Sequence, residues 1–142
     1  MILTKHFTLD ELTFTDHRTL DNVPNDLEIE NLRRLAHTLE AVRAALGNRP
    51  IVVNSAFRSV AVNAAVGGKP NSQHLNGCAA DIRVPGMTPD QVVRAILLSG
   101  LEYDQLIREF DRWTHISIPA VQGTPARRQA LIIDKTGVRP FS

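Results

Sequence analysis

The chain has 142 residues, of which 43% are hydrophobic and 22% are charged, and its formal net charge is +1. A chain of this length buries roughly 70% of its unfolded surface, which is enough for one domain with its own core. We therefore predict a single domain over residues 1–142. The near balance of basic and acidic residues argues against nucleic acid as a partner. The single cysteine, Cys78, excludes an internal disulfide.

Capping boxes mark the starts of two N-terminal helices. Thr8 and Glu11 have this spacing and predict a short helix in TLDEL. Asn25 and Glu28 begin the longest predicted helix, which Gly47 ends. The apolar residues of this longest helix follow helical spacing and are Leu32, Leu35, Ala36, Leu39, Val42 and Leu46.

The middle of the chain contains short strands and a short helix. IVVN, after Pro50, predicts a short buried strand, and Ser59 is placed to cap a small helix that ends before Gly67. The segment GGKPNSQ is expected to be a loop. In AADIRV the apolar residues alternate with Asp81 and Arg83. This pattern predicts a strand with Asp81 on its exposed face, away from the core.

The last part of the chain predicts one more helix and three strands. Thr88, Pro89 and Gln91 start the helix, and Gly100 ends it. The apolar face of this helix consists of Val92, Val93, Ile96 and Leu97. DQLIREF and THISI predict two strands joined by a tight turn, and ALIID a late strand. The element order indicates an α+β fold, with a small, mostly antiparallel sheet packed against a long N-terminal helix and shorter helices.

The stretch NSQHLNGCAADIRV carries candidate metal ligands. It places His74 near Asp81, and Gly77 lets the backbone turn between them. An imidazole nitrogen and a carboxylate oxygen are suitable zinc ligands, and three protein ligands plus an open position for water are typical of catalytic zinc. His115, in WTHISI, is the best third candidate because a strand holds a ligand in fixed geometry. We therefore predict one Zn²⁺ ion on the predicted sheet.

Several segments together resemble one enzyme family. SAFRS, GGKPNSQHLNGCAADIRV, DQLIREF and WTHISI are similar to motifs of zinc D-alanyl-D-alanine carboxypeptidases and phage L-alanyl-D-glutamate endopeptidases (endolysins), which cut peptidoglycan stem peptides. The likeness covers nearly the whole chain and includes FTLDELT, NVP and VRAALG. The ordered pattern Ser-x-His, six residues, Asp, and a distant Trp-x-His is specific. The resemblance implies that the chain is a single peptidase domain.

The resemblance also implies roles for individual residues. The residues that match the family's zinc ligands are His74, Asp81 and His115. Arg58, in SAFRS, matches an arginine that binds a substrate carboxylate or the developing oxyanion. Ser72 and Gln73 match polar residues that contact the substrate or support the ligands.

The general base departs from the family pattern. Several relatives carry an acidic residue three positions before the last histidine, where this chain has Arg112, which cannot accept a proton. We predict that Glu109 is the base, provided that a hairpin loop with an odd number of residues places Glu109 opposite His115 on the same face. Asp111, in the turn, is the alternative. The base would take a proton from water and return it to the leaving amine.

Three further side chains are open to two interpretations. Trp113 either stacks on a glycan or stem peptide or packs against the core. Arg83 shares a face with Asp81 and either contacts the substrate or hydrogen-bonds that carboxylate. Cys78 is either a metal ligand or, as we favour, a small buried hydrophobic residue.

The expected function is a phage or prophage lysis enzyme that hydrolyses peptidoglycan stem peptides or cross-links. The sequence lacks the apolar core of a secretory signal and any apolar run that could span a membrane. We therefore expect synthesis in the cytoplasm, no membrane insertion, release through a holin-type pore to the periplasm or cell exterior, and a monomeric state. Loops 15–23 and 119–129 would select the bond that is cut. The alternative is a catalytically inactive metal- or peptide-binding module of a phage structural protein.

Overall fold

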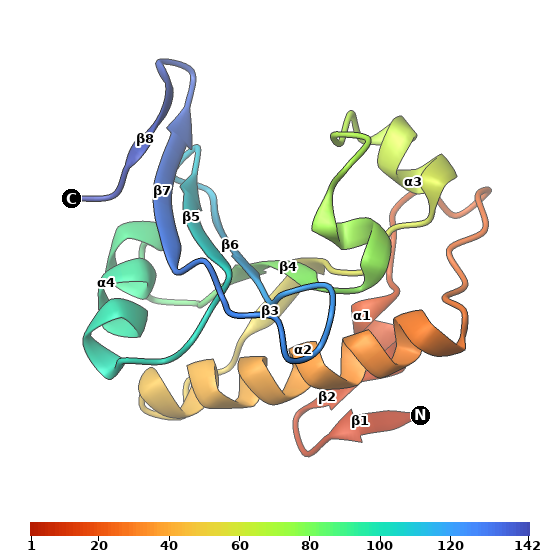
Figure 1. Cartoon of the computed structure of the whole chain (residues 1–142), viewed down its shortest axis with the longest axis horizontal. Helices are drawn as coiled ribbons and strands as arrows, with labels where there is room; N and C mark the ends of the chain where they lie inside the picture. Colours follow the sequence, from red (N-terminus) through yellow and green to blue (C-terminus); the bar gives the residue numbers. More distant parts are fainter.

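A six-stranded sheet organises the fold in the computed structural model, which describes residues 1–142. Four α-helices, one 3₁₀ helix and a separate two-stranded sheet complete the structure (Figure 1). The elements in chain order are β1 (Ile2–Thr4), β2 (Phe7–Thr8), α1 (Leu9–Leu12), α2 (Asp26–Ala45), β3 (Val52–Ser55), α3 (Val60–Ala65), η1 (Gln73–Asn76), β4 (Ala79–Arg83), α4 (Pro89–Ser99), β5 (Gln105–Glu109), β6 (Trp113–Ser117), β7 (Gln129–Asp134) and β8 (Gly137–Pro140).

The large sheet is mixed because it contains one parallel pair among otherwise antiparallel pairs, so the predicted mostly antiparallel sheet is confirmed in part. Its strands are ordered β3-β4-β6-β5-β7-β8, and every neighbouring pair is antiparallel except β5 and β7. Residues 118–128 carry the chain from β6 across to the far side of β5. Because of this crossing, β7 runs parallel to β5. The α+β class itself is confirmed.

The helices begin where the capping residues predicted. In α2 the Asn25 side chain accepts a hydrogen bond from Glu28 N, and the Glu28 carboxylate accepts one from Asn25 N, each at 2.8 Å. Capping boxes are also present at α1 and α4. The longest helix ends at Ala45, and Gly47 adopts a positive φ of 73° just beyond it. None of these helices is both long and apolar enough to cross a membrane.

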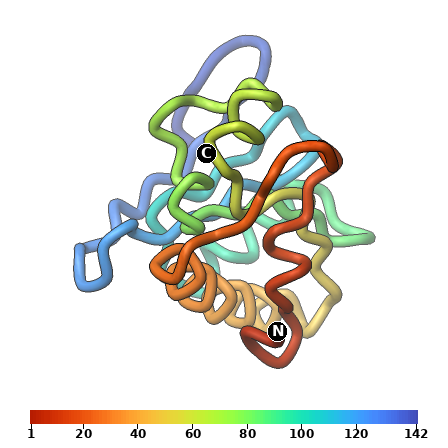
Figure 2. The backbone as a smooth tube through the Cα atoms, turned by 90° about the vertical axis from the view of Figure 1, so that its right-hand side faces the viewer, coloured from red at the N-terminus to blue at the C-terminus, as the bar shows by residue number.

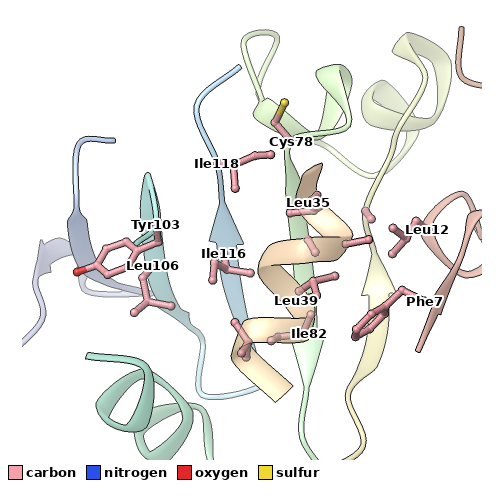
Figure 3. Packing of buried hydrophobic residues seen from close by; sticks show 14 of the residues in the cluster. Phe7, Leu12, Leu35, Leu39, Cys78, Ile82, Tyr103, Leu106, Ile116 and Ile118 are labelled. Carbon is pink, nitrogen blue, oxygen red and sulfur yellow. The ribbon is translucent and has the colours of Figure 1, made fainter. Parts of the chain in front are cut away.

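The apolar core lies between α2, α4 and one face of the large sheet. The predicted apolar residues of α2 are all buried. Leu35 and Leu39 of this helix lie in one cluster with Ile82 of β4, Ile116 of β6 and Leu106 of β5 (Figure 3). Fully burying one such side chain contributes about 1.5–3 kcal/mol. This packing fixes β4, β5 and β6, the strands that carry the polar site on their opposite face.

Some sequence expectations were wrong in detail. β3 is an edge strand with alternating exposed side chains rather than a buried strand, because it pairs only with β4. Leu97, predicted on the apolar face of α4, is 38% exposed. Strands β1, β2 and β8 were not predicted, since they are short and lack a clear apolar alternation.

The segment between α1 and α2 supports the chain that leads from β3 to α3. The Asn22 amide donates to the carbonyl oxygens of Thr13 and Phe57, at 2.8 and 3.1 Å, and its side-chain oxygen accepts from Ser59 N at 2.7 Å. Figure 2 shows the red-to-orange segment running past the yellow-green one. These contacts set the position of Arg58, which lies between Phe57 and Ser59.

Candidate metal centre

His74 is held in a turn of regular geometry, rather than in the loop that the sequence predicted. It belongs to the 3₁₀ helix η1, and the Ser72 hydroxyl at its start accepts a hydrogen bond from His74 N at 3.2 Å. Gly77 ends this helix with a φ of 74°, and a Cβ there would lie 2.9 Å from the carbonyl oxygen of Glu28 in α2. Glycine is therefore required both by the backbone conformation and by the close approach of α2.

Asp81 and His115 are brought together by the pairing of β4 with β6. They are directly opposite each other in this antiparallel ladder, so that their side chains emerge on the same face. Asp81 Oδ1 lies 3.0 Å from His115 Nδ1, and Asp81 Oδ2 lies 3.3 Å from His74 Nε2. One ligand atom from each of the three side chains lies within 4.8 Å of the other two. The structure thus assembles the predicted histidine, aspartate and histidine into one cluster.

The cluster is buried, although the sequence placed Asp81 on an exposed face. His74, Asp81 and His115 are 3%, 6% and 8% exposed. Asp81 does point away from the apolar core, as predicted, since its neighbours Ala80 and Ile82 belong to that core. It is nevertheless shielded from solvent because both imidazoles and the Arg58 guanidinium surround its carboxylate.

The protonation states of the cluster suit a metal. Burial lowers the pKa of His74, which favours the neutral imidazole. His74 Nδ1 donates to the carbonyl oxygen of Ala56 at 2.6 Å, which leaves Nε2 free to act as a ligand. Burial alone would raise the pKa of Asp81, but the charges and hydrogen bonds of His74 and His115 hold it below its ordinary value. Two nitrogens and an ionised carboxylate are a donor set that zinc accepts.

Arg58 reaches the cluster from the segment after β3. Its Nη2 donates to Asp81 Oδ2 at 3.1 Å, its Nε donates to Ser55 Oγ at 3.0 Å, and its Nη1 donates to Asn63 Oδ1 at 3.4 Å. The guanidinium is therefore oriented by three different partners. Such fixation keeps a cation at a defined position beside the metal ligands.

Asn63 and Gly68 support this position of Arg58, and sequence reasoning missed both. Besides accepting from Arg58, the buried Asn63 side chain donates to the carbonyl oxygen of Lys69 at 2.9 Å. A Cβ on Gly68 would lie 2.0 Å from Asn63 Oδ1 and 3.1 Å from Arg58 Nη1. The available signals were the Gly-Gly pair and a polar residue on the buried side of a short helix.

Glu109 lies on the same face of the sheet as Asp81 and His115. The turn between β5 and β6 has three residues, and Glu109 is opposite Trp113 while Ile107 is opposite His115. Glu109 is thus diagonal to His115, and not directly opposite it as predicted. Glu109 Oε1 lies 3.8 Å from His115 Nδ1. Burial and the negative charge of Asp81 raise the pKa of the Glu109 carboxyl.

The alternative base and the tryptophan occupy different surroundings. The Asp111 side chain is 67% exposed and forms an ion pair with Arg108 at 2.8 Å, so it is turned from the cluster. Trp113 Nε1 donates to Glu109 Oε2 at 3.1 Å. This hydrogen bond orients the carboxylate, and neither sequence interpretation of Trp113 included it. Arg112, which occupies the position of the acidic residue in relatives, has an exposed side chain.

The Gln73 side chain contacts Asp104 and Ile118, and not the cluster of His74, Asp81 and His115. Its Nε2 donates to Asp104 Oδ2 at 2.9 Å and to the carbonyl oxygen of Ile118 at 3.0 Å. Asp104 is buried and also accepts from Arg127 N and from the Arg127 guanidinium. Gln73 therefore ties η1 to the ends of β5 and β6, which is not the orientation that a substrate contact needs. The sequence gave no sign of this network.

Cys78 does not belong to the metal cluster. It is fully buried in the apolar core, as favoured from the sequence. Burial raises the pKa of its thiol to about 11, which keeps it protonated at neutral pH. Arg83 lies on the site face but donates to Asn54, and not to Asp81.

The structure is a mixed α+β protein in which His74, Asp81 and His115 could hold one metal ion, and hydrolytic zinc sites use three protein ligands of these types. The Peptidase M15 family model matches residues 5–117, a range that includes the ligand cluster, Arg58 and Glu109. The chain belongs to this family of zinc peptidases. It is also 54% identical, over 44 residues, to a zinc D-Ala-D-Ala carboxypeptidase of Streptomyces albus G. That match covers 31% of this chain and 17% of the relative.

Proposed function

We propose that this protein is a zinc-dependent peptidase that hydrolyses peptide bonds in the stem peptides or cross-links of bacterial peptidoglycan. The observation that carries the proposal is the convergence of His74, Asp81 and His115, with ligand atoms within 4.8 Å of one another. Arg58 and Glu109 flank this cluster on opposite sides, next to Asp81 and His115 respectively. The arrangement supplies a metal site, a base and a cation within one small region.

The three ligands fit one zinc ion. His74 would bind through Nε2, because its Nδ1 is occupied by the Ala56 carbonyl, and Asp81 and His115 would complete the protein ligands. A bound zinc ion would polarise the scissile carbonyl and increase the acidity of water. Ser72 and Gln73 contribute by holding the turn that carries His74.

Glu109 is proposed as the general base. Its carboxylate faces the ligand cluster, and the Trp113 indole donates to one of its oxygens. The other oxygen would accept a proton from the attacking water and return it to the leaving amine. The raised pKa of the Glu109 carboxyl makes its carboxylate a stronger base for the proton of water.

Arg58 is proposed to bind negative charge on the substrate. Its guanidinium is fixed by Ser55 and Asn63, so its position does not depend on the substrate. A fixed guanidinium beside the ligand cluster can bind either a peptide carboxylate or the oxyanion that develops during hydrolysis. The exposed part of Trp113 would offer an apolar surface to the peptide on the other side.

The biological setting is proposed from the sequence resemblance. The motifs are similar to those of phage endopeptidases, and the relative from Streptomyces albus G is a D-Ala-D-Ala carboxypeptidase. We place this protein among phage or prophage lysis enzymes that act as monomers on the cell wall after release through a holin-type pore. The bond cut would be L-Ala to D-Glu or one that involves D-Ala.

Digestion of purified bacterial cell walls tests this function. The zinc-loaded protein should release muropeptides whose new termini, identified by mass spectrometry, reveal the bond that is cut. A chelator should stop the release, and added zinc should restore it. Glu109→Gln keeps all three metal ligands and is the matched control, which should bind zinc but release almost nothing. Intact walls after incubation with the zinc-loaded wild type would contradict the proposal and favour a binding module.

A further inference from the structure

A second arginine lies on the site face, beyond the ligand cluster. Asp81 is opposite His115 and Ile82 is opposite Thr114 in the β4–β6 ladder, so Arg83 falls beside Trp113 in the next row on the Asp81 face. Two residues along a strand correspond to about 7 Å. Arg58 follows β3, which runs antiparallel to β4, and therefore lies on the other side of Asp81 along the strand direction.

The outer nitrogens of Arg83 have no partner in the protein. Its Nε donates to Asn54 Oδ1 at 3.0 Å, which anchors the inner end of the guanidinium. Nη1 and Nη2 make no hydrogen bond, and no carboxylate lies within ion-pair distance. Arg58, by contrast, uses all three of its nitrogens. Arg83 is therefore partly fixed and has two donors available.

Two more unpaired arginines lie near Arg83. A pocket of about 220 Å³ is lined by Arg83, Arg112 and Trp113 together with the 85–87 turn, and none of its lining residues is acidic. A Cβ on Gly86, in that turn, would lie 3.3 Å from Arg49 Nη1. Neither Arg49 nor Arg112 forms an ion pair. The neighbouring acids are already paired, since Asp90 binds Arg94 and Arg108, Asp111 binds Arg108, and Glu109 contacts Trp113 and His115.

We propose that Arg83, assisted by Arg112 and Arg49, is a carboxylate-binding subsite that determines substrate specificity. This inference rests on the proposed peptidase function. A guanidinium with two free donors binds a carboxylate in a bidentate manner. With Arg58 at one side of the ligand cluster and Arg83 at the other, the preferred substrates are peptides with a free carboxylate on each side of the scissile bond.

Peptides with single amidations test the subsite. The substrates are a stem tetrapeptide with all carboxylates free and variants in which each carboxylate is amidated in turn. Wild type should lose about tenfold or more in kcat/KM when one particular carboxylate, the one bound by Arg83, is amidated. With Arg83→Gln, kcat/KM for the peptide with all carboxylates free should already be reduced by this factor. Amidation of the carboxylate bound by Arg83 should then reduce kcat/KM no further. Amidation elsewhere should affect both proteins equally.

Matched variants exclude general effects of charge or folding. Arg33→Gln removes the same charge from the exposed side of α2 and should behave as wild type with every peptide. Arg112→Gln should show a smaller loss that is confined to the same amide. The proposed subsite is refuted if Arg83→Gln reduces kcat/KM by the same factor for all peptides, or if it leaves kcat/KM unchanged for all of them.

A binding measurement separates this proposal from the peptidase function. Calorimetry with the zinc-loaded protein and the same peptides reports binding whether or not a bond is cut. If wild type cleaves no peptide but binds the free form more tightly than one amide, and Arg83→Gln abolishes this preference, the hydrolytic function fails and the subsite stands. If no amide differs from the free peptide in binding, the subsite fails.

Discussion

The two halves of the proposed metal site, one on the strands and one outside the sheet, are built differently. Asp81, His115 and Glu109 come from three adjacent strands, and the ladders of the sheet place them on one face. His74 and Arg58 come from short segments that lie outside the sheet and are held by individual hydrogen bonds to Ala56, Ser55 and other groups.

The comparison shows which changes each half tolerates. In the strand half, which comprises Asp81, His115 and Glu109, many ladder hydrogen bonds hold the backbone in place. One side-chain substitution there should therefore change the reactivity of the site without moving the neighbouring residues. In the other half, a single side chain often holds the position of another, as Asn63 does for Arg58. Substitutions there should disturb the site from a distance.

The largest expected effect follows from removing a ligand of the strand half. His115→Ala leaves two of the three ligands, so the variant should neither retain zinc at stoichiometric level nor hydrolyse peptides. Elemental analysis after gel filtration, together with the cell-wall assay, measures both properties. His37→Ala, on α2 and outside the cluster, is the control and should retain zinc. Full zinc occupancy in His115→Ala would refute the ligand assignment.

Glu109→Gln should have the next largest effect. Loss of a general base lowers kcat by about 10²–10⁴-fold, while zinc content stays at one ion per chain because no ligand has changed. The matched control, Asp111→Asn, concerns an exposed carboxylate paired with Arg108 and should keep nearly full activity. If the two variants exchanged these behaviours, Asp111 would be the base.

Gly68→Ala probes the half that lies outside the sheet. The new methyl group would collide with Asn63 and displace it from Arg58, so we expect kcat/KM to fall by about tenfold or more with zinc content unchanged. Gly67→Ala is the matched control, because that position has open space but a positive φ of 73°. It should cost about 1 kcal/mol in stability and leave kcat/KM of the folded protein intact. Equal kinetic losses in both variants would contradict the role of Asn63.

The smallest expected effect concerns stability and pH. The Arg127 guanidinium and backbone hold the pKa of Asp104 below its ordinary value, despite its burial. Such a carboxylate stabilises the fold above its unfolded pKa of about 4, and the contribution is lost as pH falls through the lower folded pKa. Asp104→Asn should therefore reduce the free energy of unfolding by about 1–2 kcal/mol at pH 7, and by less below pH 4. Urea unfolding of wild type and Asp104→Asn at several pH values measures the difference in the free energy of unfolding. A difference that grows as the pH falls would refute the pairing of Asp104 with Arg127.

The sequence predicted the strand half well for physical reasons. Alternation in AADIRV separated Asp81 from the core residues, and Glu109 was expected on the same face as His115 provided that the loop had an odd number of residues, a condition that the three-residue turn meets. Local periodicity contains this information. Local periodicity does not show how deeply a side chain is buried, and the sequence therefore placed Asp81 on an exposed face.

The other half and the sheet edges could not be predicted in the same way. The contacts of Asn63 with Arg58, and of Gln73 with Asp104, join residues whose spacing follows no helical or strand period. The parallel pairing of β5 with β7 depends on where residues 118–128 cross, which no local pattern encodes. The resemblance to known peptidases pointed to Arg58, His74, Asp81 and His115 as site residues, but not to the side chains that hold them.

The C-terminal strands have a consequence for the base, although they are remote from the ligands. β5 is bonded to β6 on one edge and to β7 on the other, and β7 is bonded in turn to β8. A slip of β5 by one residue would turn Glu109 to the opposite face of the sheet, and it would have to break two ladders at once. The β7–β8 hairpin thereby fixes the register of β5, the strand that carries the proposed base, Glu109.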